Sequence, residues 1–493
     1  MSILAPLAPL RAHHGQRLTT GLDDAHIIRL AASHPDLAAA IAAAADAYAR
    51  ARHTDADLLD MDEADQVQAM QADLVNFYPD DCVSPYVALA ARGPWVVTLK
   101  GAVVYDAGGY GMLGFGHTPA SVLDALARPQ PMANVMTPNL AQRRFTGALR
   151  REIGHTRGGC PFARFMCLNS GSEAVGLAAR IADINAKLQT DAGARHAGAV
   201  IKRVVVKGSF HGRTDRPGLY SDSSRRAYVQ HLASYRGEDS VIVIPPYDEA
   251  ALRQAFADAQ QRGWFIEAVF LEPVMGEGDP GRAVPPAFYS VARELTRAHG
   301  SLLLVDSIQA GMRAHGVLSL VDYPGFEGVE PPDMETYSKA LNAAQFPLSV
   351  LAATAHAAGL YRKGVYGNTM TTNPRALEVA CATLELLTPQ LRHNIRERGA
   401  QALRGLEQLK DELGDAITRV QGTGLLFSCA LAPRYKCYGA GSIEEWLRRH
   451  GANVIHGGEN SLRFTPHFGI DAQELDLLLG LVGRALREAP QRG

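Results

Sequence analysis

The sequence predicts an α/β protein, with a large domain on a mostly parallel sheet and a smaller α/β lobe. Short apolar runs divided by glycine, which are typical of buried strands, alternate with helical stretches, and this alternation favours a parallel sheet covered by helices. A chain of 493 residues is also too long for one core and should divide into domains. Strands are predicted over 204–208, 268–274 and 301–307, and helices over 173–187 and 286–299.

The order of these elements predicts four segments along the chain. The alanine-rich stretch 36–52 strongly favours helix. Near the C-terminus, a strand is predicted over 422–431 and a terminal helix over 471–488. The segments are a helical N-terminal extension (1–80), the N-terminal part of the smaller lobe (81–115), the large domain (116–375) and a C-terminal small domain (376–493).

Composition and charge exclude several kinds of partner. The chain has 47% hydrophobic and 20% charged residues and a formal net charge of −2, so no nucleic-acid surface is expected. No apolar run approaches the ~20 residues that span a bilayer, and the N-terminus does not resemble a secretory signal. We therefore expect a cytoplasmic protein without a membrane partner. Its scattered cysteines lack a C-x-x-C pair and should be free thiols, and no metal site is expected.

Two glycine-containing stretches invite a ligand interpretation. The turn NSGSEA (169–174) lies between an apolar run and a predicted helix, where open backbone amides and the positive helix end can bind a phosphate. A plain helix start is the alternative. The second stretch, GGYGMLGFG (108–116), could be mistaken for a dinucleotide fingerprint. It is predicted to lack a preceding strand and a long helix directly after it, which disfavours that interpretation.

Two further residues suggest cofactor chemistry. Asp306 ends a predicted strand, and open α/β sheets bind ligands at the carboxyl ends of their strands, although the residue could simply cap a helix. Lys339 lies among small and apolar residues, where desolvation favours imine chemistry, although it could be a surface lysine. Together with the phosphate turn, they supply what pyridoxal 5′-phosphate requires: amide donors, an acidic partner for the ring nitrogen and an amine for the aldehyde.

From about residue 83 to the C-terminus the chain resembles the class III aminotransferases, the ornithine, acetylornithine and 4-aminobutyrate group. This resemblance implies the fold type I architecture of pyridoxal-phosphate transferases and a homodimer with shared active sites. The matching motifs occur in the order GHTP (116–119), NSGSEA (169–174), FHGRT (210–214), LEPVMGEG (271–278), VDSIQAG (305–311), SKAL (338–341), NTMTTNP (368–374), GTGLLF (422–427) and LRFTPHF (462–468).

The resemblance assigns a cofactor role to several positions. It implies that Lys339 carries the cofactor as a Schiff base and, with Asp306, forms the catalytic core. The other cofactor positions are Gly171 and Ser172 at the phosphate, Phe210 and His211 at the ring, Asp306 at its nitrogen, Gln309 at its phenolic oxygen, and Thr369 toward the neighbouring subunit's phosphate.

The resemblance also assigns substrate positions. Arg213 corresponds to an arginine that grips a substrate carboxylate, and Tyr110 to an aromatic contact. Glu277 and Arg463 correspond to a gating pair that admits two different substrates, although they could form a fixed salt bridge. The expected reaction moves an amino group from an amino acid with a terminal amine to a keto acid, with 2-oxoglutarate favoured over pyruvate. A racemase, epimerase or aminomutase on the same scaffold is the alternative, and a catalytically silent binding subunit is a third.

Four departures from the family pattern lie near the predicted cofactor site or dimer seam. They predict an outlying branch with an unusual amino donor. The departures are Ser307 in place of an acidic residue, Asn342-Ala343-Ala344 in place of a glycine run, Thr371-Thr372 in place of paired glycines, and Gly176 in place of a frequent glutamate.

Overall fold

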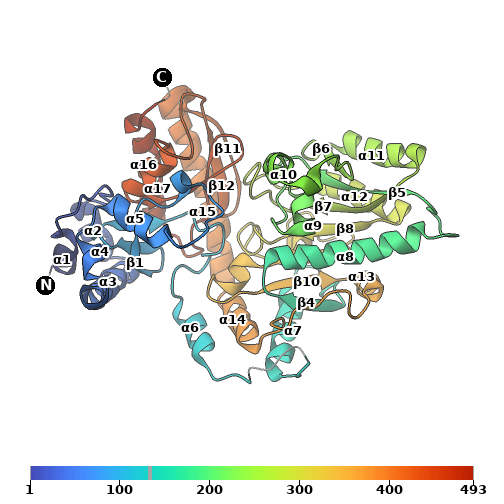
Figure 1. Cartoon of the computed structure of the whole chain (residues 1–493), viewed down its shortest axis with the longest axis horizontal. Coiled ribbons are helices and arrows are strands. Elements are labelled where there is room, and N and C mark those ends of the chain that lie inside the picture. Colours follow the sequence, from blue (N-terminus) through green and yellow to red (C-terminus); the bar gives the residue numbers. More distant parts are fainter. Residues whose placement is uncertain (1, 132–135, 492–493) are drawn as a thin grey trace. The chain divides into compact units, whose positions relative to one another are not determined.

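The chain folds into two compact units, each described by itself. The computed structural model describes residues 2–131 and 136–491. Residues 121–396 form the larger unit, and residues 1–120 and 397–493, from both ends of the chain, form the smaller one (Figure 1). The predicted fold class, an α/β protein with a mostly parallel sheet, is confirmed.

The larger unit is built on a seven-stranded sheet of order β4-β10-β9-β8-β7-β5-β6. Neighbouring strands from β9 to β6 are parallel, while β10 runs antiparallel to both β9 and β4. All strands except β10 therefore end at the same edge. Their bounds are β4 Arg164–Leu168, β5 Val200–Val206, β6 Val241–Ile244, β7 Trp264–Leu271, β8 Leu302–Asp306, β9 Met334–Tyr337 and β10 Ser349–Ala353.

Helices cover this sheet, and its central strands β7, β8 and β9 are buried along nearly their whole length. Every residue of β8 is buried, as expected for a parallel strand covered on both faces. Helix α8 (Gly171–Thr190) packs along β10, β9 and β7, while α11 (Glu249–Arg262) and α12 (Pro286–His299) pack against β7 (Figure 1). The other helices are α6 Ala120–Ala127, α7 Leu140–Glu152, α9 Asp215–Tyr220, α10 Arg225–His231, α13 Ala355–Leu360, α14 Pro374–Glu385 and α15 Pro389–Leu413, which continues into the smaller unit.

The predicted elements of this unit are confirmed, with one shift. Helix α12 has the predicted bounds, and the helix predicted over 173–187 lies within α8. The predicted strands 268–274 and 301–307 overlap β7 and β8. Strand β5 begins earlier than predicted, at Val200, and ends at Val206, because the chain turns at Gly208, whose φ is 82°.

The smaller unit contains two four-stranded sheets, of order β1-β2-β3-β13 and β11-β12-β15-β14. The single strand predicted over 422–431 is wrong, because the chain turns at Gly424 (φ 58°) and forms a hairpin of β11 and β12. The strands are β1 Ala88–Arg92, β2 Trp95–Thr98, β3 Val103–Asp106, β11 Ile417–Thr423, β12 Leu426–Leu431, β13 Ala452–Asn453, β14 Ile455–Gly457 and β15 Ser461–Phe464.

The helices of the smaller unit come from both ends of the chain. The predicted alanine-rich helix is confirmed as α3, which packs against β1 and β2 and buries Leu37 and Ile41. The terminal helix is confirmed as α17, which follows the N-cap Asp471. The helices are α1 Ala8–Arg11, α2 Asp24–Ala31, α3 Pro35–Thr54, α4 Ala56–Leu59, α5 Glu63–Gln71, α16 Ile443–Arg449 and α17 Ala472–Glu488.

The elements of this unit test two expectations from the sequence, one about the glycine-rich stretch 108–116 and one about membrane-spanning helices. A strand, β3, does precede the glycine-rich stretch 108–116, contrary to prediction, but the next helix, α6, begins only at Ala120 and is short. Within the described ranges, no single helix is long and apolar enough to cross a bilayer. The bent pair α2 and α3 reaches the threshold by length and composition alone.

Candidate active site

Five of the motifs lie at the carboxyl edge of the seven-stranded sheet. Asp306 is the last residue of β8, and it is 4% exposed. Ligands bind outside this edge in open α/β sheets, so the topology gathers segments that are far apart in the sequence. The other four motifs are 169–174 after β4, 210–214 after β5, 271–278 after β7 and 338–341 after β9.

The turn at the start of α8 leaves two amides open. Ser170 and Glu173 form a capping box, and the Glu173 carboxylate also accepts the Asn169 amide at 2.7 Å. Among the residues that the structure describes, no acceptor meets the N–H groups of Gly171 and Ser172, the first two residues of the helix. Open amides at the positive end of a long helix form an anion site, as predicted for a phosphate.

Glycines bring two loops against this turn. A Cβ added to Gly171 would lie 2.7 Å from Cδ1 of Ile308, two residues after Asp306. A Cβ added to Gly212, whose φ is 112°, would lie 2.2 Å from Oγ of Ser172. The two close approaches place the loop after β5 and the loop after β8 beside the open amides.

Asp306 is surrounded by hydrogen-bond donors. Its Oδ2 lies 2.9 Å from Nδ1 of the buried His211, and its Oδ1 accepts the Thr336 hydroxyl at 3.0 Å. The Ile308 amide donates to the same Oδ1 at 3.2 Å. This arrangement places a hydrogen-bonded carboxylate at the sheet edge, where a protonated ring nitrogen would need a partner.

A second buried carboxylate, Glu272, supports the loop that carries Phe210. It accepts the Phe210 amide at 3.0 Å and the Gly276 amide at 3.1 Å. Burial raises the pKa of Glu272 to about 7, and the nearby His211 charge opposes that rise. A Cβ on Gly276 would lie 2.2 Å from Cδ of Gln309, so the predicted cofactor residue Gln309 packs directly on this loop. Sequence reasoning missed Glu272, although the LEP of the 271–278 motif contains it.

Lys339 stands in an unusual backbone conformation. It begins a short 3-10 helix, Lys339–Asn342, after β9, and its φ is 49°. Ala343 and Ala344 follow with φ of 50° and 58°, and Thr372 has φ of 60°. A left-handed non-glycine residue costs about 1–2 kcal/mol. Three departures from the family's glycines therefore keep a conformation suited to glycine, at the cost of backbone strain.

Ser307, which replaces the family's acidic residue, contacts an acidic residue on the neighbouring strand β9. The Ser307 hydroxyl donates to Oε1 of Glu335 at 2.5 Å, and Ser319 donates to Oε2 at 2.6 Å. The Leu320 amide donates to Oε1 at 2.9 Å. An acidic group therefore remains beside Asp306 in this chain, but β9 supplies it. Because Glu335 is fully buried, its pKa rises to about 7 despite these donors.

This raised pKa predicts a pH dependence of stability. Between about pH 5 and 7 folded Glu335 holds a proton that the unfolded chain releases, since the ordinary pKa is 4.5, so rising pH should destabilise the fold. Relative to Glu335→Gln, the wild-type free energy of unfolding should fall by about 1–3 kcal/mol over that range and then level off. Urea unfolding of both proteins at a series of pH values measures this, and parallel curves would contradict it.

Two predicted substrate residues lie together on the larger unit. An Arg213 guanidinium nitrogen lies 3.8 Å from a Glu277 carboxylate oxygen, and both side chains are partly exposed. The same guanidinium lies over the Phe210 ring at 5.2 Å and donates to the Ser224 hydroxyl at 3.0 Å. Arg213 is therefore positioned beside a predicted cofactor residue, with a carboxylate close enough to screen its charge.

Thr369 lies on an exposed loop of the larger unit. The neighbouring Asn368 side chain donates to Oε1 of Glu173 at 2.9 Å, which ties this loop to the start of α8. Met370, the next residue, is 56% exposed. The role of Thr369 toward a neighbouring subunit stays a prediction.

The remaining two predicted substrate residues belong to the smaller unit. Arg463, on β15, is 1% exposed, and its guanidinium lies over the Tyr110 ring at 5.3 Å. The Tyr78 ring lies 5.9 Å from that of Tyr110, and burial raises the pKa of Tyr110. Sequence reasoning missed Tyr78, for which the aromatic pair in NFYP (76–79) was the available signal. Because Glu277 lies in the other unit, its pairing with Arg463 stays a prediction.

Comparison with known proteins agrees with this geometry. The sequence profile of the family described as Aminotransferase class-III matches residues 77–486. The chain belongs to the class III aminotransferase family. The recognition made from the motifs is confirmed.

Curated relatives of this class III aminotransferase share a modest fraction of identical residues with it. An acetylornithine aminotransferase of Neisseria meningitidis serogroup B is 28% identical over 423 residues, which cover 83% of the chain and 96% of the relative. Another, of Xanthomonas axonopodis pv. citri, is 33% identical over 277 residues, which cover 56% of the chain and 64% of the relative. The latter alignment thus spans just under two thirds of its relative.

Solved structures show the same fold. An ornithine aminotransferase from Toxoplasma gondii has a TM-score of 0.72 at 23% identity and covers 88% of this chain and 98% of its own. An acetylornithine aminotransferase from Elizabethkingia anophelis has a TM-score of 0.68 at 21% identity, covering 87% and 100%. At such identities the likeness concerns the fold alone.

The residues at the sheet edge fit the cofactor of this family. Class III aminotransferases use pyridoxal 5′-phosphate, and a second Toxoplasma gondii structure is described with partial occupancy of it at the active site. Here the open amides of Gly171 and Ser172 suit its phosphate, and the carboxylate of Asp306 suits its ring nitrogen. The buried Nε2 of His211 also has no hydrogen-bond partner among the described residues, as expected where a bound group would complete the site.

Proposed function

We propose that this chain moves an amino group from an amino acid with a terminal amine to a keto acid, with 2-oxoglutarate as the acceptor, in a ping-pong reaction. The observation that carries the proposal is the buried Asp306 with its three donors, beside the open amides of Gly171 and Ser172. A structural carboxylate would not need both a buried charge and an adjacent anion site. The catalytically silent alternative has no such support.

Each residue at the edge has one task in this scheme. Pyridoxal phosphate, when bound, supplies an electron sink for the carbanion at the substrate carbon. The amides of Gly171 and Ser172 would hold its phosphate, and Asp306 would keep the ring nitrogen protonated. Lys339 would hold the cofactor through its amine, and the same amine would act as the base and acid that moves the proton at the substrate carbon.

The substrate assignment rests on guanidinium chemistry. Arg213 and Arg463 can each bind a carboxylate through two hydrogen bonds, so a dicarboxylate such as 2-oxoglutarate would use both. A donor that reacts at a terminal amine brings one carboxylate and a positive end, which an unscreened guanidinium would repel. Glu277 can supply the screening charge. Its position 3.8 Å from Arg213 shows that it already lies near one guanidinium.

The assembly we propose is a homodimer with shared active sites. It rests on the exposure of Thr369, which leaves this residue accessible to a second subunit, and on its resemblance to the threonine that reaches the neighbouring subunit's phosphate. A monomer in light scattering at micromolar concentration, with activity retained, would contradict the proposed dimer.

A substrate panel tests the acceptor and the gating pair. Terminal amines should be assayed with 2-oxoglutarate and with pyruvate in wild type, Arg463→Ala and Glu277→Ala. Loss of one bidentate carboxylate contact, worth about 1.5–3 kcal/mol, should raise the KM for 2-oxoglutarate in Arg463→Ala about 10- to 100-fold. The KM for pyruvate, a monocarboxylate, should change much less and serves as the internal control.

Two outcomes would redirect the assignment. An unchanged KM for 2-oxoglutarate in Arg463→Ala would remove the gating pair, and pyruvate would become the first acceptor to consider. Racemisation or rearrangement of an amino acid with no keto acid present would instead favour the racemase, epimerase or aminomutase alternative.

A further inference from the structure

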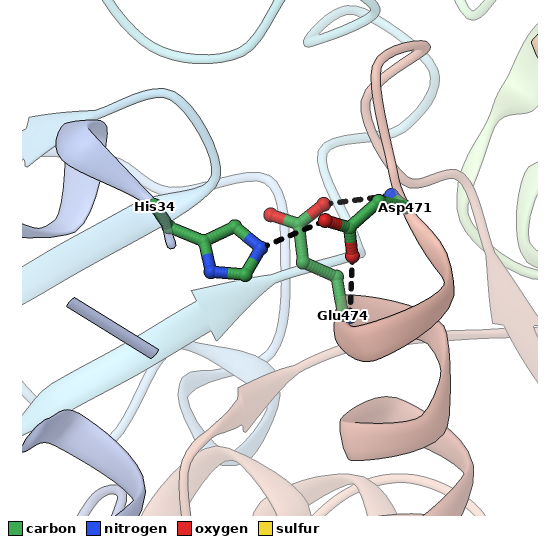
Figure 2. Close-up of side chains that lie close together, drawn as sticks. All are labelled: His34, Asp471 and Glu474. Atoms are coloured by element: carbon green, nitrogen blue, oxygen red, sulfur yellow. Dashed lines mark hydrogen bonds and ion pairs between the residues drawn. The ribbon is translucent and has the colours of Figure 1, made fainter. Parts of the chain in front are cut away.

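A cluster of metal-binding side chains lies in the smaller unit, on elements that hold none of the predicted site residues. His34, at the start of α3, faces Asp471 and Glu474, at the start of α17 (Figure 2). One ligand atom from each of the three residues lies within 4.8 Å of the others. The His34 and Glu474 side chains are 10% and 3% exposed, whereas that of Asp471 is 52% exposed and leaves a path from solvent.

The two carboxylates each have one oxygen anchored and one turned toward the cluster. Oδ1 of Asp471 accepts the Glu474 amide at 2.9 Å. Oε2 of Glu474 accepts the Asp471 amide and lies near Nε2 of His467, both at 3.0 Å. Figure 2 shows the other Glu474 oxygen directed at the His34 ring, beside Oδ2 of Asp471. Outer partners that orient each ligand in this way are the usual second layer of a metal site.

His34 carries the strongest indication, from a count of its protons. Its Nδ1 lies 3.0 Å from the Leu30 carbonyl oxygen, which can only accept. The Ser33 hydroxyl, also near Nδ1, can use its own hydrogen on Oε1 of Gln473 at 3.0 Å. The Leu30 oxygen therefore favours the tautomer with the proton on Nδ1. Yet Nε2 lies 3.0 Å from Oδ2 of Asp471, a second acceptor, and a neutral imidazole has only one N–H group.

Two arrangements satisfy this geometry. In one, His34 carries two protons and forms an ion pair with Asp471, while Glu474 pairs with His467 through Oε2. In the other, a divalent cation lies between the bare Nε2 and the two carboxylates, whose charges it neutralises. The second arrangement uses all three converging residues, whereas in the first only Nε2 of His34 and Oδ2 of Asp471 contact each other.

We propose that His34, Asp471 and Glu474 bind one Zn²⁺ ion through Nε2, Oδ2 and the free Glu474 oxygen. Mixed imidazole and carboxylate ligands suit zinc, and water takes the fourth position that three protein ligands leave open. The ion ties the N-terminal helices to α17, across 437 residues of sequence. Its role is structural, because metal bound by the folded state alone stabilises that state.

Zinc binding is tested on the full-length, cofactor-loaded protein after treatment with EDTA and exchange into chelator-free buffer near neutral pH. After incubation with Zn²⁺ and desalting, mass spectrometry of the metal content should find about one zinc per chain. The Tm should rise with added Zn²⁺ and fall again with EDTA. Zinc binding should also release protons if His34 carries two protons before the ion binds.

Three variants should differ in how strongly they lose zinc binding. His34→Gln should lose the bound zinc and the zinc-dependent rise in Tm. His467→Gln removes only an outer partner and should weaken zinc affinity roughly 10- to 100-fold while keeping the stoichiometry. His26→Gln is the matched control, because His26 also pairs with a carboxylate, Asp23 at 2.8 Å, but belongs to no three-ligand group among the described residues. The zinc content of this variant should equal that of wild type.

The proposal is overturned if wild type retains no zinc, or if His34→Gln retains as much as wild type. A His34→Gln protein that is less stable while wild type shows no zinc-dependent Tm would mean that the cluster is only an ion pair. Because the wild-type measurements need no variant, a variant that failed to fold would not block the test.

Discussion

Lys339→Ala should abolish steady turnover and remove the visible absorbance of a lysine-bound cofactor. The variant loses both the amine that holds the cofactor and the group that moves the proton. Acid–base catalysis alone contributes about 10²- to 10⁴-fold, so the combined loss should be at least ~10³-fold. Spectroscopy of the cofactor-supplemented variant, together with single-turnover kinetics, separates the loss of attachment from the loss of proton transfer.

Lys363→Ala is the matched control for this experiment. Lys363 is an exposed lysine of the same unit, and its replacement should leave both the absorbance and the rate unchanged. If the Lys339 variant kept the absorbance band, another lysine would hold the cofactor and the assignment would be wrong.

Asp306→Ala should lower the rate by about 10³-fold or more, which corresponds to about 4 kcal/mol of transition-state stabilisation. The variant loses the buried negative charge that keeps the ring nitrogen protonated, while the amides of Gly171 and Ser172 remain to hold the phosphate. The absorbance of bound cofactor should therefore persist although turnover fails. Asp306→Asn, which keeps the shape and removes the charge, should be nearly as slow.

Thr336→Val provides the graded comparison. It removes one of the three donors to Asp306, the hydroxyl at 3.0 Å, and keeps the carboxylate. Loss of one hydrogen bond of about 1.5 kcal/mol predicts roughly a tenfold decrease in rate. An Asp306→Asn variant with wild-type kinetics would show that charge at this position is not needed, and the proposed electron-sink role would fail.

The elements that the sequence predicted well are those whose own residues decide their structure. Helix α12 is bounded by Pro286 and by Gly300 in a left-handed C-cap, and β8 is apolar up to its last residue, Asp306, so both could be recognised locally. The segment 422–431 was predicted as one strand, although Gly424 within it is the residue at which the chain reverses into the hairpin of β11 and β12. Nor could the helix content of the N-terminal extension reveal that α3 packs against β1 and β2.

The residues of the candidate site likewise fall into those that the sequence could predict and those that it could not. Motif residues such as Asp306 and Lys339 were identified because their roles follow from residue type and order in the family. The hydroxyl–carboxylate contact of Ser307 with Glu335 was not, because it joins two neighbouring strands that are separated by a long connection. The alanines Ala343 and Ala344 were noted as departures, but only their φ angles show that the backbone there is left-handed.

The pairing of β3 with β13 affects how the chain folds during synthesis. Tyr105 of β3 lies opposite Ala452 of β13, so roughly 350 residues must be made before the partner of this edge exists. At translation rates of about 5–20 residues per second, β3 waits roughly 20–70 s, with the whole larger unit emerging in between. During that interval, the newly made N-terminal segment presents an open strand edge that could pair with another nascent chain. A cell that makes this protein would therefore benefit from chaperone binding to the first 120 residues until the C-terminal segment arrives.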